Sequence, residues 1–258
     1  MDRPVDINCD MGESFGPWKM GRDAEIMPFI TAANIACGFH AGDPLVMAQT
    51  ITLAQRHGVA VGAHPGYRDL HGFGRRPMDC SEEEVYGDVL YQLGAIDAFC
   101  RAQGVRLRHV KPHGALYNVA ARDERTARGI VRAIRAFDPD LILYALPGGQ
   151  LAREGEKSGL RVAYEVFADR NYNPDGTLVS RRLGDAFVHD PEQAAERVLR
   201  MVTEGKVRAV DGSDVPVRAD TVCIHGDGPM AVEIARAVRQ RLEAAGLTVA
   251  PLGGGAGV

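Results

Sequence analysis

The sequence lacks the features that mark membrane, secreted and nucleic-acid-binding proteins. No apolar run approaches the roughly 18 residues that a membrane-spanning helix needs, and the first residues have neither the basic start nor the apolar stretch of a signal peptide. Lysine and arginine together number 30 against 34 aspartates and glutamates, with no basic run, so there is no electrostatic footprint for nucleic acid or anionic lipid. We therefore expect a cytoplasmic protein with a small-molecule ligand and no nucleic-acid or membrane partner.

Several motifs of familiar chemistry are also absent. The five cysteines are an odd number without a C-x-x-C pair, which argues against a disulfide framework or a zinc knuckle and predicts buried thiols. The chain contains no G-x-x-x-x-G-K-[ST] phosphate loop and no G-x-S-x-G nucleophile elbow. ATP chemistry is therefore not obviously housed in this chain, and a serine nucleophile is not expected.

What the sequence does contain is a regular alternation of expected strands and helices. With 258 residues, 45% of them hydrophobic, the chain can bury a full core, and we expect one domain over residues 1–252 and a flexible glycine-rich tail over 253–258. Strands are expected at 5–10, 30–37, 59–63, 107–110, 141–145, 161–167 and 221–224, and a short one at 247–249. Helices are expected at 45–56, 81–103, 123–137, 150–157, 191–204 and 230–245.

The polar residues that follow these strands favour a closed barrel over an open sheet. An open sheet gathers its site at one switch point, whereas here polar side chains follow nearly every expected strand. Seven or eight strand–helix alternations of this kind predict an α/β fold, a single-domain (β/α) barrel with seven strands. Residues 173–187 are rich in glycine and turn formers, and we expect them to form an inserted loop or hairpin over the site.

The stretch Lys111-Pro112-His113 shows the pattern most clearly. It follows the expected strand 107–110, and Pro112 and Gly114 end regular pairing, so that a cation and an imidazole lie at the end of the strand. In a parallel barrel the carboxyl ends of all strands meet at one face, which is where barrel enzymes hold their active sites. The candidate site residues are Asp10, Glu13, His40, His64, Lys111, His113, Glu165, Arg170, His225 and Asp227, with Arg75 as a further guanidinium that could clamp a carboxylate or phosphate.

Two interpretations of these residues compete. One is a metal site built from ordinary ligand types, which are Asp10, His40, His64 and His225. The other gives Lys111 the task of a metal, the stabilisation of developing negative charge. His109 and His113 have H-x-x-x-H spacing, but in an extended strand they would lie roughly 13 Å apart, too far to share one zinc ion. His109 is therefore expected in the core, and dependence on a divalent metal stays open.

Seven stretches carry a resemblance to a known family. They are DINCDMG (6–12), ANIACGFHAGDP (33–44), GAHP (62–65), GFGRR (72–76), KPHGALYN (111–118), FADRNY (167–172) and IHGD (224–227). Together, in this order and between about residues 5 and 250, they resemble the LamB/YcsF family.

The resemblance implies a barrel similar to the glycoside hydrolase/deacetylase class and the activity of a 5-oxoprolinase. In that activity the lactam of 5-oxo-L-proline is opened with water to L-glutamate, coupled to ATP hydrolysis, together with two partner subunits, B and C. The missing phosphate loop agrees with ATP being bound mainly by these partners. The sequence lacks the histidine-rich metal motif of the related metal-dependent deacetylases in working geometry, so no residue is assigned as a metal ligand.

For this activity the sequence suggests a hypothesis about individual roles. Asp10 would orient or deprotonate the attacking water, Lys111 would stabilise the oxyanion, and His113 or His64 would protonate the ring nitrogen. Arg170 would hold the substrate carboxylate. Lys111→Met is expected to abolish turnover without unfolding the chain. Supporting or substrate-binding positions would be Glu13, His40, Arg75, Glu165, His225 and Asp227.

Three other classes of function remain open at this stage. They are a stand-alone metal-dependent amidohydrolase or deacetylase, a carbohydrate-binding or transport-related module, and a non-catalytic scaffold for partner subunits. A sugar-binding surface would use stacking aromatic rings, but Trp18 is the single tryptophan and aromatic residues make up just 6% of the chain. Metal analysis would test the first class. The scaffold gains support if activity survives loss of the histidine and lysine residues.

Overall fold

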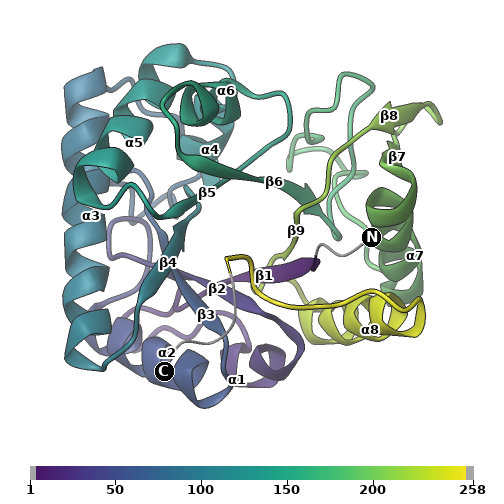
Figure 1. Ribbon diagram of the computed structural model, residues 1–258, viewed down its shortest axis with the longest axis horizontal. Helices are drawn as coiled ribbons and strands as arrows, with labels where there is room; N and C mark the ends of the chain where they lie inside the picture. The colour runs from purple at the N-terminus through teal and green to yellow at the C-terminus, as the bar shows by residue number, and fades with distance from the viewer. Residues whose placement is uncertain (1–3, 254–258) are drawn as a thin grey trace.

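Seven parallel strands close into a barrel in the computed structural model, which describes residues 4–253 (Figure 1). The strands pair in the order β1-β2-β3-β4-β5-β6-β9, and β9 pairs with both β6 and β1 to complete the ring. They are β1 (Asp6–Met11), β2 (Ala32–Ala36), β3 (Ala60–His64), β4 (Leu107–Val110), β5 (Ile142–Ala145), β6 (Arg161–Phe167) and β9 (Thr221–Ile224). The predicted seven-stranded (β/α) barrel is confirmed.

The predicted helices surround the barrel (Figure 1). They are α2 (Pro44–Arg56), α3 (Glu82–Ala102), α5 (Glu124–Phe137), α6 (Gln150–Lys157), α7 (Pro191–Glu204) and α8 (Ala231–Ala244). Two begin as the sequence indicates. The Asp43 side chain accepts hydrogen bonds from the backbone N–H groups at the start of α2, and Ser81 and Glu84 form a capping box at the start of α3. No helix within the described residues is long and apolar enough to cross a membrane.

Three short helices are not predicted by the sequence. They are α1 (Asp23–Ile26), the 3₁₀ helix η1 (Met27–Phe29) and α4 (Gly114–Ala120). Each is too short for apolar periodicity to show. Helix α4 matters for the site because it begins directly after His113, where Gly114 has a φ of +50° and a Cβ would lie 2.8 Å from the Gly74 carbonyl oxygen. Glycine is therefore required at this turn.

Three further segments lie outside the barrel strands. The strand expected at 247–249 is wrong, since Val249 forms a single bridge to Val5. Between α7 and β9, β7 (Lys206–Arg208) and β8 (Asp214–Pro216) pair as an antiparallel hairpin. Of the expected tail, residues 254–258 lie outside the described residues.

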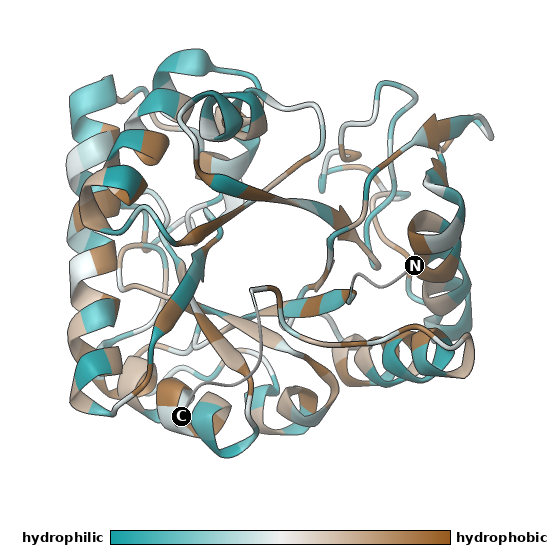
Figure 2. Cartoon of the chain, in the orientation of Figure 1, coloured by the Kyte–Doolittle hydropathy of each residue, from teal (hydrophilic) through white to brown (hydrophobic). Residues whose placement is uncertain are grey.

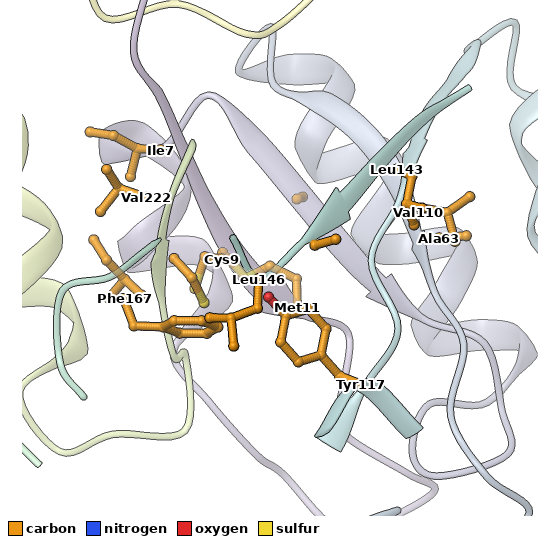
Figure 3. Close-up of a cluster of buried hydrophobic side chains, with 14 of the residues drawn as sticks. Ile7, Cys9, Met11, Ala63, Val110, Tyr117, Leu143, Leu146, Phe167 and Val222 are labelled. Atoms are coloured by element: carbon orange, nitrogen blue, oxygen red, sulfur yellow. The ribbon is translucent and has the colours of Figure 1, made fainter. Parts of the chain in front are cut away.

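Apolar side chains on the outer face of the barrel form the main core. In β1, Ile7, Cys9 and Met11 are fully buried and belong to this core, and Ile7 lies in register with Val222 of β9 (Figure 3). The helices that cover the strands combine hydrophobic and hydrophilic faces (Figure 2). All five cysteines are free and buried, as predicted. Because the strands alternate, the residues between these apolar positions point into the barrel.

The interior of the barrel is polar, beginning at its floor with Asp6. The Asp6 carboxyl accepts hydrogen bonds from Thr31 at 2.6 Å, Tyr144 at 2.9 Å and Thr221 at 2.5 Å. The side chain is fully buried. Burial outweighs these three hydrogen bonds and raises the pKa of Asp6 from 3.8 to about 6.

Next to this floor, the barrel interior contains a hydrogen-bonded pair of asparagines, Asn8 and Asn34, which connects to Asp10. Asn34 donates to Asn8 Oδ1 at 2.7 Å and to Asp10 Oδ1 at 2.9 Å. Its own Oδ1 lies 2.7 Å from His109 Nε2. The His109 ring also stacks on Tyr144, with 4.3 Å between ring centres. His109 is thus a buried interior residue apart from the other histidines, as predicted.

The raised pKa of Asp6 predicts a specific dependence of stability on pH. Because the folded pKa of about 6 exceeds the unfolded value of 3.8, the folded chain holds this proton more tightly, and stability is lost as pH rises between these two values. The loss is about 3 kcal/mol once Asp6 is ionised. Asp6→Asn removes this titration. Urea unfolding of both proteins should therefore show the variant gaining about 2.4 kcal/mol over wild type between about pH 4 and about pH 7. A constant difference across this range would contradict the assignment.

Candidate active site

A cavity opens at the end of the barrel where the sequence places its polar residues. Its volume is about 40 Å³. Seven predicted site residues line it, namely Asp10, His64, Arg75, Lys111, His113, Arg170 and His225. The other lining residues are Pro112, Gly114, Tyr117, Asn118, Phe167, Leu178 and Arg181. The convergence expected from barrel geometry is therefore present.

The four remaining predicted residues lie around this cavity without lining it. Asp227 forms an ion pair of 2.5 Å with Arg75 at the mouth. The other three, Glu13, His40 and Glu165, are buried behind the wall. A substrate in the cavity would therefore not touch these three side chains directly. They would affect it only through the residues that line the cavity.

Lys111 lies at the centre of a buried group that we call the lysine cluster. Its Nζ is 2.8 Å from Asp10 Oδ1 and 3.1 Å from Glu165 Oε1. Nζ also donates to Asn8 Oδ1 at 3.3 Å and lies 2.9 Å from Cys223 Sγ. The side chains of Lys111 and the two acids are at most 7% exposed. The ammonium is thus already surrounded by acceptors, and Glu165 lies one layer below the cavity.

The lysine cluster keeps Asp10 ionised. Burial alone would raise the pKa of the Asp10 carboxyl, but His64 and Lys111 outweigh it and hold that pKa well below its ordinary value. Burial would likewise lower the pKa of Lys111, but Asp10, Cys223 and Glu165 outweigh it and raise that pKa. A carboxylate and an ammonium therefore face the cavity together.

Beside the lysine cluster lies a group of Glu13, His40, His64 and His113, which we call the histidine cluster. The His64 Nε2 and His113 Nδ1 atoms are 3.0 Å apart, and His40 stacks flat on His113 with 3.7 Å between ring centres. Glu13 Oε1 lies 3.5 Å from His40 Nε2 and 3.6 Å from His113 Nδ1. His64 Nε2 also lies 3.4 Å from Asp10 Oδ1, which joins the two clusters.

Burial sets the protonation of the histidine cluster. It lowers the pKa of His40 and of His113 well below the ordinary value. It also raises the pKa of Glu13, where the negative charge of Asp10 acts in the same direction. The imidazoles of His40 and His113 are therefore uncharged at neutral pH.

His225 is oriented by an acid that the sequence did not single out. Its Nδ1 lies 2.9 Å and 3.0 Å from the two carboxylate oxygens of Asp169. A carboxylate only accepts, so Nδ1 carries the proton and Nε2 is the acceptor nitrogen of the neutral ring. Burial would raise the pKa of Asp169, but His225 outweighs it and lowers that pKa. The signal was available, because Asp169 follows the strand at 161–167 as directly as Arg170 does.

The positions of Arg170 and Arg181 differ from what the sequence hypothesis assumed. Arg170 is buried and donates to the backbone carbonyls of Val179 and Ala186, so it holds the predicted loop over the site. Arg181 from that loop lines the cavity, with its guanidinium 5.3 Å from the Phe187 ring. The sequence does not identify Arg181, because an irregular loop has no periodicity that shows which side chain points inward.

Two groups of described residues have the composition of a metal site. The first is the histidine cluster, whose ligand atoms all lie within 4.8 Å of one another, and the second is Asp10, Cys223 and His225. The Lys111 ammonium already contacts Asp10 at 2.8 Å and Cys223 at 2.9 Å in the second group. The ligand set suggested by the sequence, which joined Asp10 and His225 to His40 and His64, is therefore divided between two places.

The profile of the LamB/YcsF family matches residues 5–256. This chain belongs to the LamB/YcsF family. A relative from Symbiobacterium thermophilum, named as the A subunit of 5-oxoprolinase, is 59% identical over 247 residues, which cover 96% of this chain and 95% of the relative. A relative of the same name from Thermus thermophilus is 57% identical over 245 residues, which cover 95% and 98%.

One solved structure is similar to this chain in both sequence and fold, and a second is similar in fold alone. The crystal structure of a lactam utilization protein from Thermus thermophilus superposes with a TM-score of 0.91 at 55% identity, covering 96% of this LamB/YcsF chain and 99% of that one. A proposed cellobiose-phosphate cleavage protein from Enterococcus faecalis has a TM-score of 0.57 at 13% identity, covering 97% of each chain. At that identity the second likeness shows a shared fold alone.

The lysine cluster predicts that Lys111→Met destabilises the chain. Methionine would leave Asp10 and Glu165 buried without their cation, and breaking a buried ion pair in this way costs about 3–5 kcal/mol. The free energy of unfolding in urea at neutral pH should fall by about this amount. The sequence-based expectation of an intact fold is therefore revised, because the sequence does not show how deeply Lys111 is buried.

Matched variants separate this effect from the loss of any lysine. Lys157→Met, at a side chain that is 73% exposed, should leave the stability unchanged within about 0.5 kcal/mol. Adding Asp10→Asn and Glu165→Gln to Lys111→Met removes the uncompensated charges and should restore part of the loss. A Lys111→Met protein as stable as wild type would contradict the role of the lysine cluster.

Proposed function

We propose that this chain is the A subunit of an ATP-dependent 5-oxoprolinase, in which the lactam of 5-oxo-L-proline is opened with water to L-glutamate. The observation that carries the proposal is the 57–59% identity, over nearly full length, to relatives named as the A subunit of 5-oxoprolinase. The name of the similar Thermus thermophilus structure, a lactam utilization protein, supports a lactam as the substrate class. The polar cavity at the end of the barrel is the site we assign to this chemistry.

The reaction needs coupling to ATP because the lactam amide is resonance-stabilised and its ring closes readily. Phosphorylation of the carbonyl oxygen activates ring carbon C5. Water then forms a bond to C5, the C5–N bond breaks as the nitrogen takes a proton, and hydrolysis of the resulting acyl phosphate by a second water releases phosphate and L-glutamate. Since the chain has no phosphate loop, we assign ATP mainly to partner subunits B and C.

Asp10 and Lys111 are the charged pair that we assign to the water attack. Asp10 is ionised and lines the cavity, so it can accept a hydrogen bond from the attacking water and orient it. A carboxylate with so low a pKa is a weak base, which argues for a separate acceptor of the proton. The Lys111 ammonium stabilises negative charge on the reacting oxygen by exchanging one of its present acceptors for it.

The proton carrier that the geometry supports best is His225. The hydrogen bond from Nδ1 to Asp169 fixes the tautomer of His225, so that Nε2 is the nitrogen that can accept a proton. The His225 side chain also lines the cavity. The sequence hypothesis gave this task to His64 or His113. Those rings donate instead to backbone carbonyls and face one another. We therefore assign His225 to accept the proton of the water and deliver it to the ring nitrogen.

Arg181 is the group that we assign to the substrate carboxylate. Two donor groups of Arg170 already bind backbone carbonyls. Arg181, in contrast, lines both the inner cavity and a wider outer cavity of about 740 Å³. A guanidinium at the junction of the two can bind a carboxylate through two parallel hydrogen bonds as the substrate enters. Arg75 is held at the mouth by Asp227.

One observation favours a second candidate function, a stand-alone metal-dependent amidohydrolase or deacetylase. It is the histidine cluster, which has the composition of a metal site next to the cavity. This function requires neither ATP nor partner subunits. Opening of 5-oxoproline, or release of acetate from acetylated sugars, by the isolated chain without ATP would support it over the proposal.

Reconstitution tests the proposed function directly. Mixed with subunits B and C, the chain should support ATP hydrolysis that depends on 5-oxoproline and forms glutamate. His225→Gln should lower kcat by roughly 10²–10⁴-fold, the range for loss of a group that transfers protons. Asp10→Asn should also lower kcat, because it removes the charge that orients the attacking water. His57→Gln, at an exposed histidine after α2, should behave as wild type. Full activity of Asp10→Asn would remove the assigned role of Asp10.

Neighbouring arginines test the carboxylate site. Arg181→Gln should raise KM for 5-oxoproline by roughly 10–100-fold, because it removes a hydrogen bond to a charged group worth about 1.5–3 kcal/mol. Arg182→Gln is the matched control, since Arg182 is exposed and absent from the inner cavity wall. Its KM should stay within about twofold of wild type. Equal effects of the two variants would indicate general electrostatic attraction in place of a specific contact.

A further inference from the structure

The hydrogen bonds of His64 and His113 determine where each ring carries its proton. His64 Nδ1 lies 2.7 Å from the Lys111 carbonyl oxygen, and His113 Nε2 lies 2.8 Å from the Phe73 carbonyl oxygen. A carbonyl oxygen can only accept, so both of these nitrogens carry hydrogen. In the neutral rings, the lone pairs are therefore on His64 Nε2 and His113 Nδ1.

These two lone pairs face each other. The atoms that carry them are 3.0 Å apart, so a single positive species at this point, either a proton or a metal ion, is needed to join the two rings. Such an arrangement is repulsive unless a positively charged species lies at the meeting point. Both residues are buried, so bulk water does not screen this repulsion.

Glu13 and His40 add further unsatisfied groups at the same point. Among the described residues, Glu13 Oε1 and both ring nitrogens of His40 are buried without a hydrogen-bond partner. Glu13 Oε1 lies 3.6 Å from His113 Nδ1 and 3.5 Å from His40 Nε2. Buried polar groups are normally satisfied, so this concentration of unpaired polar atoms points to an absent partner that can bind several of them.

We infer that Glu13, His40, His64 and His113 form a binding site for one divalent transition metal ion of the Zn²⁺ type. Zinc bound to nitrogen and oxygen at about 2.0–2.1 Å in a tetrahedron places neighbouring ligand atoms about 3.3 Å apart. Three of the separations in the histidine cluster, 3.0, 3.5 and 3.6 Å, bracket that value, and all of its ligand atoms lie within 4.8 Å of one another. Three imidazoles with one carboxylate suit zinc and its neighbours better than magnesium or calcium, which prefer oxygen ligands.

A shared proton explains less of the arrangement than a metal ion does. One proton between His64 and His113 would satisfy that pair, but it would leave Glu13 Oε1 and both His40 nitrogens without partners. A metal ion near the same point has a possible ligand atom from each of the four residues close by, since these atoms all lie within 4.8 Å of one another, and a small rotation of the stacked His40 ring would direct its lone pair to the ion. The position is also distinct from the other group with metal-site composition, where the Lys111 ammonium contacts Asp10 and Cys223.

The surrounding backbone holds the rings as a built site requires. A Cβ on Gly66 would lie 2.6 Å from His40 Nδ1, and one on Gly74 would lie 2.7 Å from His40 Cβ and 2.8 Å from His113 Cδ2. Glycine at both positions lets the main chain pack directly on the rings. Carbonyl oxygens that fix the tautomers of ligating histidines are the usual outer layer of a metal site, and His64 and His113 each have one.

The inference does not rest on the proposed lactam chemistry. When bound, such an ion would supply positive charge beside the cavity that His64 and His113 line. Binding of the metal is measurable on the isolated full-length chain, so failure of the reconstituted activity and failure of this inference are distinguishable.

The test is metal binding by the full-length chain after treatment with a chelator and dialysis. Titration with Zn²⁺, followed by calorimetry and by elemental analysis after gel filtration, should show about one ion per chain, and Co²⁺ should give the visible absorption of a tetrahedral site. Glu13→Gln and His40→Gln should each weaken Zn²⁺ binding by at least about 100-fold. Zn²⁺ should raise the melting temperature of wild type but not of these variants.

Controls define the outcomes that overturn the inference. Exposed His57→Gln, and Cys223→Ser in the other candidate group, should bind Zn²⁺ as wild type does. Circular dichroism of the chelated proteins checks that each variant is folded, and Glu13→Gln keeps the size of the side chain if His40→Gln is unstable. No stoichiometric binding to wild type, or undiminished binding by both cluster variants when folded, would overturn the site. A cobalt spectrum lost in Cys223→Ser would place the ion in the other group and would also overturn it.

Discussion

The contacts of the Lys111 ammonium with Asp10 and Glu165 are the interaction on which the rest of the structure depends. The three residues come from the end of β4, from β1 and from β6, so they meet only when the barrel is closed. Removal of ions from water costs several kcal/mol for each ion unless the geometry compensates it. Here the three charges, with Asn8 beside them, lie close enough to do so. The same contacts fix Asp10 as a carboxylate at the cavity.

This arrangement is possible because the barrel keeps its apolar core on the outside. Residues such as Ile7 and Val222 pack beneath the helices (Figure 3), which leaves the interior positions for polar side chains. The interior hydrogen bonds run from Asp6 through Thr221, Asn8 and Asn34 to Asp10, and a connected buried network of this kind is rigid. The strands thus supply a rigid set of charges and imidazoles, while Arg181 comes from a loop.

Much of the fold and part of the site could be predicted from the sequence. The strand ends at Asp10, His64 and Lys111 follow from local alternation and from breakers such as Pro112, which are properties of the sequence itself. Pairing across the barrel is different, because the register of closed strands decides it. The stacking of His40 on His113 and the contact of Asp169 with His225 therefore emerge only from the structure. Arg181 lies in an irregular loop, where neither periodicity nor register gives its direction.

The most direct test of this account is a carbon-13 NMR titration of the Asp10 carboxyl in wild type and in Lys111→Met, over the pH range in which each stays folded. The account predicts that wild-type Asp10 stays ionised well below its ordinary pKa of 3.8. In Lys111→Met the pKa should rise, because burial then acts with less opposing positive charge. A wild-type Asp10 that titrates at or above 3.8, or a pKa that does not change in the variant, would contradict the account.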